Sequence, residues 1–439
     1  MKPARPCCRL AAVLLLAATA FAVLAPVPAR AKPALPELPV HSELTLGAEL
    51  GSLLDYARAR NPAYAAAQAE NRALDARATA AGRWPDPRLR VELMDMTRMG
   101  TQNLNLLPGR VGSTRYLWMQ EIPWLGKNAL KQEVARGEAE AAHYGTQAAW
   151  LDIAARIKAG FAQRYALHQS LQLTGEMLEL MVRLEQIART RYAHGLATQQ
   201  DVIRAQLEQT ALRSERINLE METHHEDARL NTLLARPLHA VLQPPVQLPA
   251  LPPVAALDET ALATRLQQHS PWLQAQEVNV QAAEKNRALA EKNRYPDVTL
   301  GFAPVQYQHA VRQWDLMIEM TIPLQQETRR AQESEAASRL EAAQRRQDAT
   351  AHQLLAELTE ALSGLDAARR TARLMNEDLL PQAELTYQAA LAGYEAGRLD
   401  FATLLEAQRQ IRQGRLNRLK AEVEARLRLA QIERLVGGL

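Results

Sequence analysis

The sequence carries one ordered set of landmarks twice, about 200 residues apart, and this duplication limits what the chain can fold into. A proline interrupts a helical stretch first at Asn61-Pro62 and again at Ser270-Pro271. The matching landmarks that follow are the stops Trp84-Pro85-Asp86 and Tyr295-Pro296-Asp297, the pairs Ile122-Pro123 and Ile322-Pro323, the Tyr-x-x-Gly motifs that end at Gly195 and Gly397, and a helical stretch after each motif. Five landmarks in the same order predict two copies of one structural unit.

The two Tyr-x-x-Gly motifs predict the tips of long antiparallel helical hairpins, at about 192–201 and 394–404. Glycine adopts positive φ easily, so a helix can end there and the chain can reverse. The stretch 127–192 contains no proline, and as one helix it would be roughly 100 Å long. Only 5% of residues are aromatic, and Ala, Leu, Gln, Glu and Arg dominate, which favours long helices over a sandwich or a large barrel.

Between the proline stops, each copy changes to the period of a β-strand. Leu89, Val91 and Leu93 alternate with polar residues, and Trp314, Leu316 and Ile318 do the same in the second copy. We therefore predict strand hairpins at about 88–122 and 297–322. Their strands are near the 9–11 residues that cross a membrane, although a soluble hairpin is an alternative.

The first 31 residues have the features of an export signal. Lys2, Arg5 and Arg9 precede an apolar run, 10–24, and Ala29-Arg30-Ala31 fits the cleavage pattern of small residues. We predict a signal peptide at 1–31, with an uncleaved anchor as the alternative. Both cysteines, Cys7 and Cys8, lie in this segment, so the exported chain would have no disulfide and no lipid-bearing cysteine.

The remaining boundaries follow from the repeat. We predict a leader at 32–45, a first repeat at 46–236, a proline-rich linker at 237–257 and a second repeat at 258–439.

Charge and motifs exclude several classes of function. The chain has 52 basic and 49 acidic residues, and loss of four basic residues with the signal peptide would change its net charge from +3 to −1. A nearly neutral chain gives no support to nucleic-acid binding. A phosphate-binding glycine loop, Gly-x-Ser-x-Gly and His-Glu-x-x-His are all absent, so we expect neither an enzyme nor a cofactor.

Three groups of residues invite a metal or pH interpretation that we do not adopt. His224-His225-x-Asp227 places neighbours about 100° apart on a helix, which favours a solvated face over a metal site. Met94, Met96 and Met99 could contact soft metals, but methionine is also ordinary packing material, and we favour that interpretation. His194 could sense pH, but an exposed turn residue is the simpler interpretation.

Four membrane strands in one chain would leave two unpaired sheet edges. Each orphan amide in lipid costs several kcal/mol, so the sheet must close with other chains. Three copies would give twelve strands, a workable barrel size. The polar helices would extend away from the lipid and pack as coiled coils. The predicted fold class is mainly α with a small β part, in which duplicated helical hairpins form an α-barrel.

These residues carry a resemblance to a known family. The chain resembles the TolC-like outer-membrane efflux proteins, and in particular their heavy-metal branch, over nearly all of the exported sequence. The match rests on Asn61-Pro62, the aromatic-Pro-Asp stops, the segment from Ile122 to Lys127 and both Tyr-x-x-Gly tips. The resemblance implies a homotrimer with an outer-membrane barrel and a periplasmic helical tunnel. It further implies a periplasmic adaptor and an inner-membrane pump, often of the proton-driven RND type.

The resemblance also implies roles for a few positions. Gly195, Leu196 and Gly397 fall at tips that contact the adaptor in the family. Asp201 and Tyr394 match positions of polar links that close the entrance in the founding member, whereas Leu399 falls where that member has an arginine. An Asp201–Tyr394 contact would favour the closed state; the alternative is that Asp201 only helps to start the return helix.

The leading functional hypothesis is a passive outer-membrane exit duct of a tripartite efflux pump in a Gram-negative bacterium. It would carry small substrates, with heavy-metal cations among the candidates. A second hypothesis is the duct of an ABC-type protein secretion system. A third is a periplasmic coiled-coil scaffold or adaptor that never enters a membrane.

Overall fold

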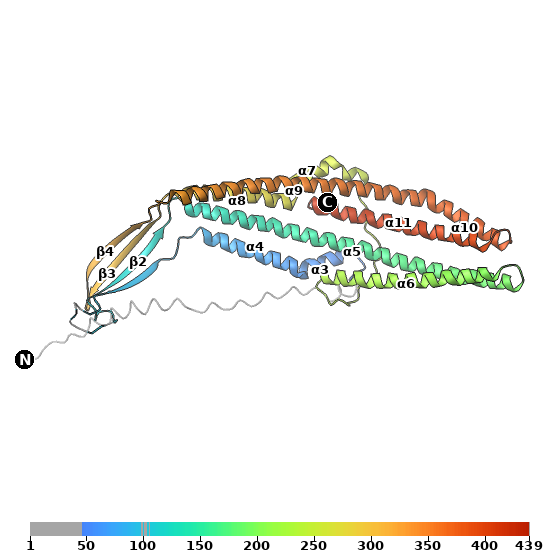
Figure 1. The fold of residues 1–439 in the computed structure, drawn as a ribbon, viewed down its shortest axis with the longest axis horizontal. Coiled ribbons are helices and arrows are strands. Elements are labelled where there is room, and N and C mark those ends of the chain that lie inside the picture. The colour runs from blue at the N-terminus through green and yellow to red at the C-terminus, as the bar shows by residue number, and fades with distance from the viewer. Residues whose placement is uncertain (1–45, 98–99, 101–102, 105, 439) are drawn as a thin grey trace, which may run out of the picture. The chain divides into compact units, whose positions relative to one another are not determined.

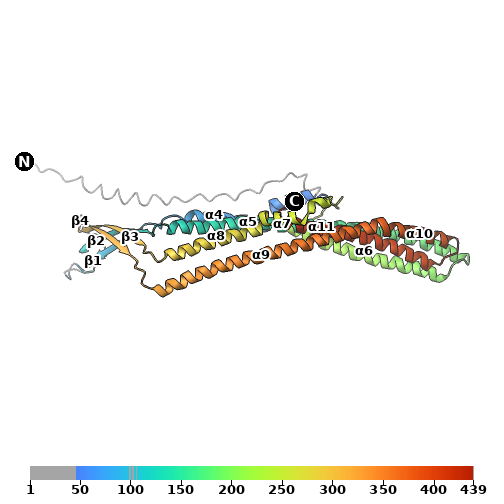
Figure 2. The ribbon, with the colours of Figure 1, turned by 90° about the horizontal axis from the view of Figure 1, so that it is seen from above.

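The computed structural model describes residues 46–438 apart from 98–99, 101–102 and 105. The predicted signal peptide and leader lie outside this range, as does Met99. Within it the chain is mainly helical with one small sheet, as the sequence predicted. The sheet lies at one end of the helices and both Tyr-x-x-Gly turns lie at the other (Figures 1 and 2).

The first repeat contains α3 (Leu50–Arg60), α4 (Pro62–Ala81), α5 (Lys127–Ala193) and α6 (Gln199–Leu233). Asn61 separates the first two helices, and its side chain accepts a hydrogen bond from Tyr64 N at 3.0 Å. This is the helix cap that a residue before proline is suited to make. The 67 residues of α5 confirm the predicted long helix, which is about 100 Å in length.

The second repeat follows the same plan with one departure. It contains α7 (Glu259–His269), α8 (Pro271–Lys292), α9 (Gln326–Leu374), α10 (Leu380–Glu395) and α11 (Phe401–Leu435). A π-helical turn, Met375–Leu379, separates α9 from α10 just before Pro381. Proline has no N–H to donate and its ring crowds the preceding turn, so the helix widens there. The sequence pattern alone does not predict this turn.

Four antiparallel strands form the sheet, in the order β1 (Arg88–Met94), β2 (Ser113–Ile122), β3 (Val298–Tyr307) and β4 (Ala310–Met320). Both predicted hairpins are confirmed, and the β2–β3 pairing joins the two repeats. Among the described residues, the outer edges of β1 and β4 have no strand partner.

The two faces of the sheet differ in character. Alternate residues of all four strands place large apolar side chains on one face, where they are exposed. These are Leu89, Val91, Trp118, Leu300, Phe302, Trp314, Leu316 and Ile318. The opposite face has a small buried apolar cluster of Leu117, Met119 and Ala303. Charged residues lie beside it, and Arg115 forms ion pairs with Glu92 at 3.4 Å and Asp315 at 3.2 Å. An exposed apolar face of this size marks a surface that meets lipid or another chain.

Helix α5 is the central packing element, because it contacts α4, α6, α8 and α11. Among the described residues, no helix is long and apolar enough to cross a membrane.

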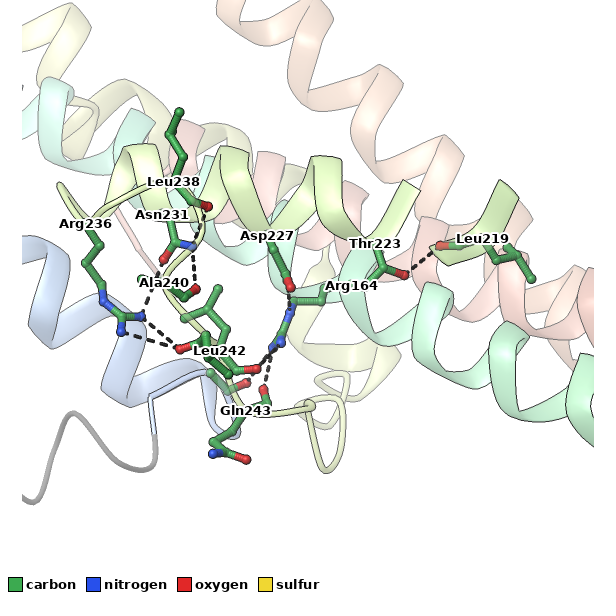
Figure 3. A network of polar contacts seen from close by, with 12 residues as sticks. Arg164, Leu219, Thr223, Asp227, Asn231, Arg236, Leu238, Ala240, Leu242 and Gln243 are labelled. Carbon is green, nitrogen blue, oxygen red and sulfur yellow. Dashed lines mark hydrogen bonds and ion pairs between the residues drawn. The ribbon is translucent and has the colours of Figure 1, made fainter. Parts of the chain in front are cut away.

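A buried arginine fixes the linker to the helices (Figure 3). Arg164 of α5 is only 1% exposed, and its guanidinium donates to Asp227 of α6 at 2.5 Å. It also donates to the carbonyl oxygens of Leu242 at 2.7 Å and Gln243 at 2.5 Å. Asn231 holds the same loop by donating to the carbonyl of Ala240 at 2.8 Å. A desolvated charge is tolerated here because nearly every donor has an acceptor.

We predict that Arg164→Met will release the linker, because it leaves Asp227 without its partner and two carbonyls without donors. Breaking a buried ion pair from one side costs roughly 3–5 kcal/mol, toward the low end here since Asp227 is partly exposed. Limited proteolysis between residues 237 and 257 measures the release. Arg229→Met, which removes an exposed partner of Glu226, is the control and should leave cleavage unchanged.

The same cluster should be sensitive to acid through His168. Burial lowers the pKa of His168, the nearby charge of Arg164 lowers it further, and Asp227 opposes them. The folded chain therefore binds this proton less readily than the unfolded chain. The contribution of His168 to stability is complete above about pH 6.5 and is lost as the pH falls. Cleavage of the linker should rise between pH 7.5 and 5.5, and His168→Gln should flatten that rise; an equal rise in both chains would contradict it.

Candidate functional site

The two tips have the same backbone geometry. Gly195 and Gly397 have φ values of +71° and +70°. In the first tip Gly195 N donates to Tyr192 O and Leu196 N to Arg191 O, and the second tip repeats this pattern with Gly397 and Arg398. This is the Schellman arrangement, in which a glycine beyond the helix end satisfies its last carbonyls. The predicted role of the two glycines in ending the helices is confirmed.

The predicted adaptor-contact residues lie on the surface of the tips. Leu196 is 67% exposed, and Tyr192 and His194 beside it are also exposed. An exposed leucine at a turn held by hydrogen bonds offers a rigid apolar contact for another protein. The adaptor role of Gly195, Leu196 and Gly397 itself stays a prediction.

The structure places Asp201 and Tyr394 near each other without a hydrogen bond between them. Asp201 is the third residue of α6, and its carboxylate accepts from Thr198 N at 3.3 Å in a capping box. The Tyr394 hydroxyl is buried and has no hydrogen-bond partner. Burial raises the pKa of Tyr394, and the negative charge of Asp201 raises it further. Within one chain, Asp201 therefore does what the alternative interpretation expected, and its gating role stays a prediction.

The tip residue that sequence reasoning missed is Arg191. Its guanidinium lies 4.9 Å from the centre of the Tyr394 ring. It also donates to the carbonyl oxygens of Tyr394 at 2.7 Å and Glu395 at 2.9 Å, the last turn of α10. A cation at a helix C-terminus is favourable, and the ring contact adds a cation–π attraction. Arg191 thus connects the first tip to the second. The two residues of this contact are 203 positions apart, so no local sequence pattern predicts it.

Below Arg191 the two hairpins share a core. Tyr394 packs edge-to-face on Phe401, with ring centres 5.5 Å apart, and Met181 and Leu184 of α5 are buried in the same cluster. Further along, Arg409 of α11 pairs with Glu208 of α6 at 2.6 Å. Apolar burial with a polar tie above it holds the tips together.

The residues with a metal interpretation do not gather into a site. His224 and His225 are exposed, while Asp227 is occupied by Arg164. Met94 and Met96 are exposed near the first hairpin turn. Over the part of the chain that the structure describes, no group of three or more His, Cys, Asp or Glu residues could hold a metal ion.

Helical hairpins of this length, attached to a sheet with an apolar exposed face, define a class of membrane-associated tunnel proteins. A family model for the outer membrane efflux protein matches residues 53–236 and 262–438, and these two ranges lie inside the predicted repeats 46–236 and 258–439. The chain belongs to this outer-membrane efflux family. Membership makes it an outer-membrane transport component with a long periplasmic helical portion rather than an enzyme or a scaffold outside the membrane.

Individual relatives support the same assignment. The chain is 23% identical over 359 residues to the cobalt-zinc-cadmium resistance protein CzcC of Cupriavidus metallidurans, covering 80% of this chain and 81% of CzcC. The fold is similar to that of the outer-membrane channel OprN, with a TM-score of 0.78 and 19% identity over 94% of this chain and 98% of OprN. CusC has a TM-score of 0.74 and 17% identity over 94% of this chain and 99% of CusC. The resemblance to TolC-like proteins of the heavy-metal branch is confirmed.

The geometry of the tips predicts that Tyr394→Phe will be tolerated. The substitution removes a buried hydroxyl without a partner and leaves the ring, so tip stability should change by no more than about 1 kcal/mol. Arg191→Ala should loosen the tip, because it removes two charge-assisted hydrogen bonds and the ring contact. Hydrogen exchange of the 192–198 amides measures both. A large effect of Tyr394→Phe would instead indicate that its hydroxyl has a partner in the assembled protein.

Proposed function

We propose that this chain is the passive outer-membrane exit duct of a tripartite efflux pump. The observation that carries the proposal is the sheet, whose apolar face is exposed and whose two edges are unpaired among the described residues. In lipid such a sheet must close, and three copies give the twelve strands of a barrel. Helices of about 100 Å would then continue the barrel as a tunnel.

The proposed partners follow from the ends of the molecule. The apolar strands face lipid, and the exposed tips around Leu196 meet a periplasmic adaptor, which links the duct to an inner-membrane transporter of the RND type. The duct would spend no energy of its own. A protein-secretion duct that works with an ABC-type exporter is the alternative, and the similarity to CzcC favours the efflux function.

The proposed substrates are divalent heavy-metal cations, because the curated relative with 81% of its length covered is a cobalt, zinc and cadmium resistance protein. Deleting the chain from its host should lower tolerance to Co²⁺, Zn²⁺ and Cd²⁺ and leave drug tolerance unchanged. Loss of a secreted protein with normal metal tolerance would support the secretion alternative.

The test of the duct itself is extraction from the outer membrane, followed by native mass and conductance in a planar bilayer. A trimer that conducts supports the proposal, and a monomer without conductance contradicts it.

We predict that the leak conductance of this trimer is set by the tie between the tips. Arg191→Ala should raise it several-fold, because the last turn of α10 then loses its hydrogen bonds to α5 and only the apolar core below still holds the tips together. Asp201→Ala should raise it less, since its carboxylate caps its own helix. Arg189→Ala, which removes an exposed arginine two residues away, is the control. Equal conductance of Arg191→Ala and the unaltered chain would contradict this gate.

Adaptor contact is tested by Leu196→Ser. Since Leu196 is exposed and outside the shared core, the variant should conduct normally in a bilayer but fail to restore metal tolerance to the deletion strain. Val241→Ser, which changes an even more exposed apolar residue on the linker, should restore it. Full rescue by Leu196→Ser would place the adaptor contact elsewhere.

A further inference from the structure

A polar pocket of about 290 Å³ lies where the sheet joins the helices (Figure 1). Its wall is formed by the first turns of α5 and α9, the end of α8, and the residues just before β3 and just after β4. Six side chains that can donate hydrogen bonds line it: Lys127, Thr321, Gln325, Thr328, Arg329 and Gln332. The pocket is therefore suited to a ligand that accepts hydrogen bonds.

The pocket carries an unbalanced positive charge. Its charged lining residues are Lys127, Asp297 and Arg329, which are two cations and one anion. The carboxylate of Asp297 already accepts from Lys127 Nζ at 2.9 Å and from Trp124 N at 2.8 Å. Because that carboxylate is held by the lysine, the charge of Arg329 is the one left over.

The guanidinium of Arg329 is incompletely satisfied. It donates to the carbonyl oxygen of Asn293, which has no net charge, and its Nε is buried without a hydrogen-bond partner among the described residues. Glu333, one turn further along α9, pairs instead with Arg294 at 2.8 Å, and no carboxylate of the described chain forms an ion pair with Arg329. Burying a guanidinium N–H without an acceptor costs free energy, so the site favours a ligand that supplies one.

This arginine belongs to the second repeat alone. Ile122-Pro123 and Ile322-Pro323 align the two copies with an offset of 200, so Ala129 is the counterpart of Arg329. The first copy thus forms the same boundary between sheet and helix with an alanine at this place. The duplicated architecture does not require a cation here, and the arginine calls for another explanation.

The pocket lies on the side of the sheet opposite the exposed apolar face. Val298 pairs with Met320, and one step beyond this pair Thr321 N donates to Asp297 O at 3.3 Å. Successive residues of a strand alternate between the two faces, so Asp297 and Thr321 lie opposite the apolar face. In the proposed duct the apolar face meets lipid, and the pocket then opens toward the channel interior.

We propose that this pocket binds a small oxyanion from the channel interior, with a phosphate or carboxylate group held by Arg329. A guanidinium presents paired N–H donors that match the oxygens of such a group. The hydroxyls of Thr321 and Thr328 and the amide of Gln332 can donate to the same group. The first turn of α9 adds a positive partial charge, and its N-cap Gln325 forms no side-chain cap. The inference rests on the proposed duct only for the side from which the anion enters.

A bound oxyanion would cancel the charge of Arg329 at the point where the tunnel meets the barrel. The carboxylates nearby do not do so, because Asp297 is held by Lys127 and Glu327 of the same turn does not line the pocket. A free cationic side chain repels cations that pass it, and a neutralised one does not. The preference of the duct for cations should therefore rise when the pocket is occupied.

Binding is tested with inorganic phosphate and the full-length protein in detergent, by the broadening of the phosphorus resonance in NMR. Arg329→Gln should weaken binding by about tenfold or more, because it removes the charge and the paired donors. Arg329→Lys, which keeps the charge, should weaken it less. Arg330→Gln changes an exposed neighbour that does not line the pocket, and should bind like the unaltered chain. Equal binding by Arg329→Gln and the unaltered chain, with the same circular dichroism, overturns the site, as does an absence of binding by the unaltered chain.

A lipid headgroup carries the same phosphate chemistry, and native mass after extraction from phosphatidylglycerol vesicles separates the two sources. We expect the unaltered chain and Arg329→Gln to retain this lipid equally, since the pocket lies away from the apolar face. Lipid that is retained by the unaltered chain, lost in Arg329→Gln and not displaced by inorganic phosphate would overturn the entry from the channel interior.

Reversal potentials in a planar bilayer under a KCl gradient measure the effect on transport. Added phosphate should shift the unaltered trimer toward cations, and Arg330→Gln should keep this shift. Arg329→Gln should prefer cations without phosphate and show no further shift. Phosphate binding without any shift in the unaltered trimer overturns the position of the pocket in the channel. A chain that binds phosphate through Arg329 but forms no conducting trimer overturns the proposed duct and leaves the anion site standing.

Discussion

A strand that enters a bilayer must have every backbone N–H and C=O group hydrogen-bonded, and four strands alone do not meet this condition. The chain satisfies most of it internally, because β2 and β3 are paired on both sides. The small residue Gly301 lets β3 lie close to the side chains of both neighbouring strands, β2 and β4. A side chain at Gly301 would lie 3.0 Å from Leu117 and 3.1 Å from Met317. Among the described residues, the backbone groups left without a strand partner are confined to the outer edges of β1 and β4.

Much of this fold could be predicted because helix-breaking and turn-forming residues mark the ends of its elements. Proline and glycine act within a few residues, so the break at Asn61-Pro62 and the tip at Gly195 are readable without knowledge of what packs around them. Strand periodicity is equally local, and both hairpins were found from it. Repetition then strengthened each assignment, because an ambiguous signal in one half had a counterpart in the other.

The residues that could not be predicted act over long distances in the sequence. Arg164 is one arginine among many in a helical stretch, and only folding brings Asp227 and the linker carbonyls around it. Arg191 likewise depends on a carbonyl 203 residues away. For Asp201 the family resemblance indicated a polar link to Tyr394, whereas the structure gives its carboxylate a bond three residues away. A residue can therefore match a family position correctly and still form its hydrogen bond with a residue nearer in the sequence.

The π-helical turn at Met375–Leu379 makes the two hairpins mechanically different. In the first repeat α5 runs without interruption to its tip, whereas α9 and α10 meet at this turn, where the α-helical hydrogen-bond pattern is interrupted. The helix can bend more easily at such a turn. The turn directly precedes α10, whose last turn is held by Arg191. In a closed ring of three copies, stiff and compliant hairpins would alternate around the axis. The symmetry would then be nearly sixfold at the sheet and threefold at the tips, with deformation concentrated in every second hairpin.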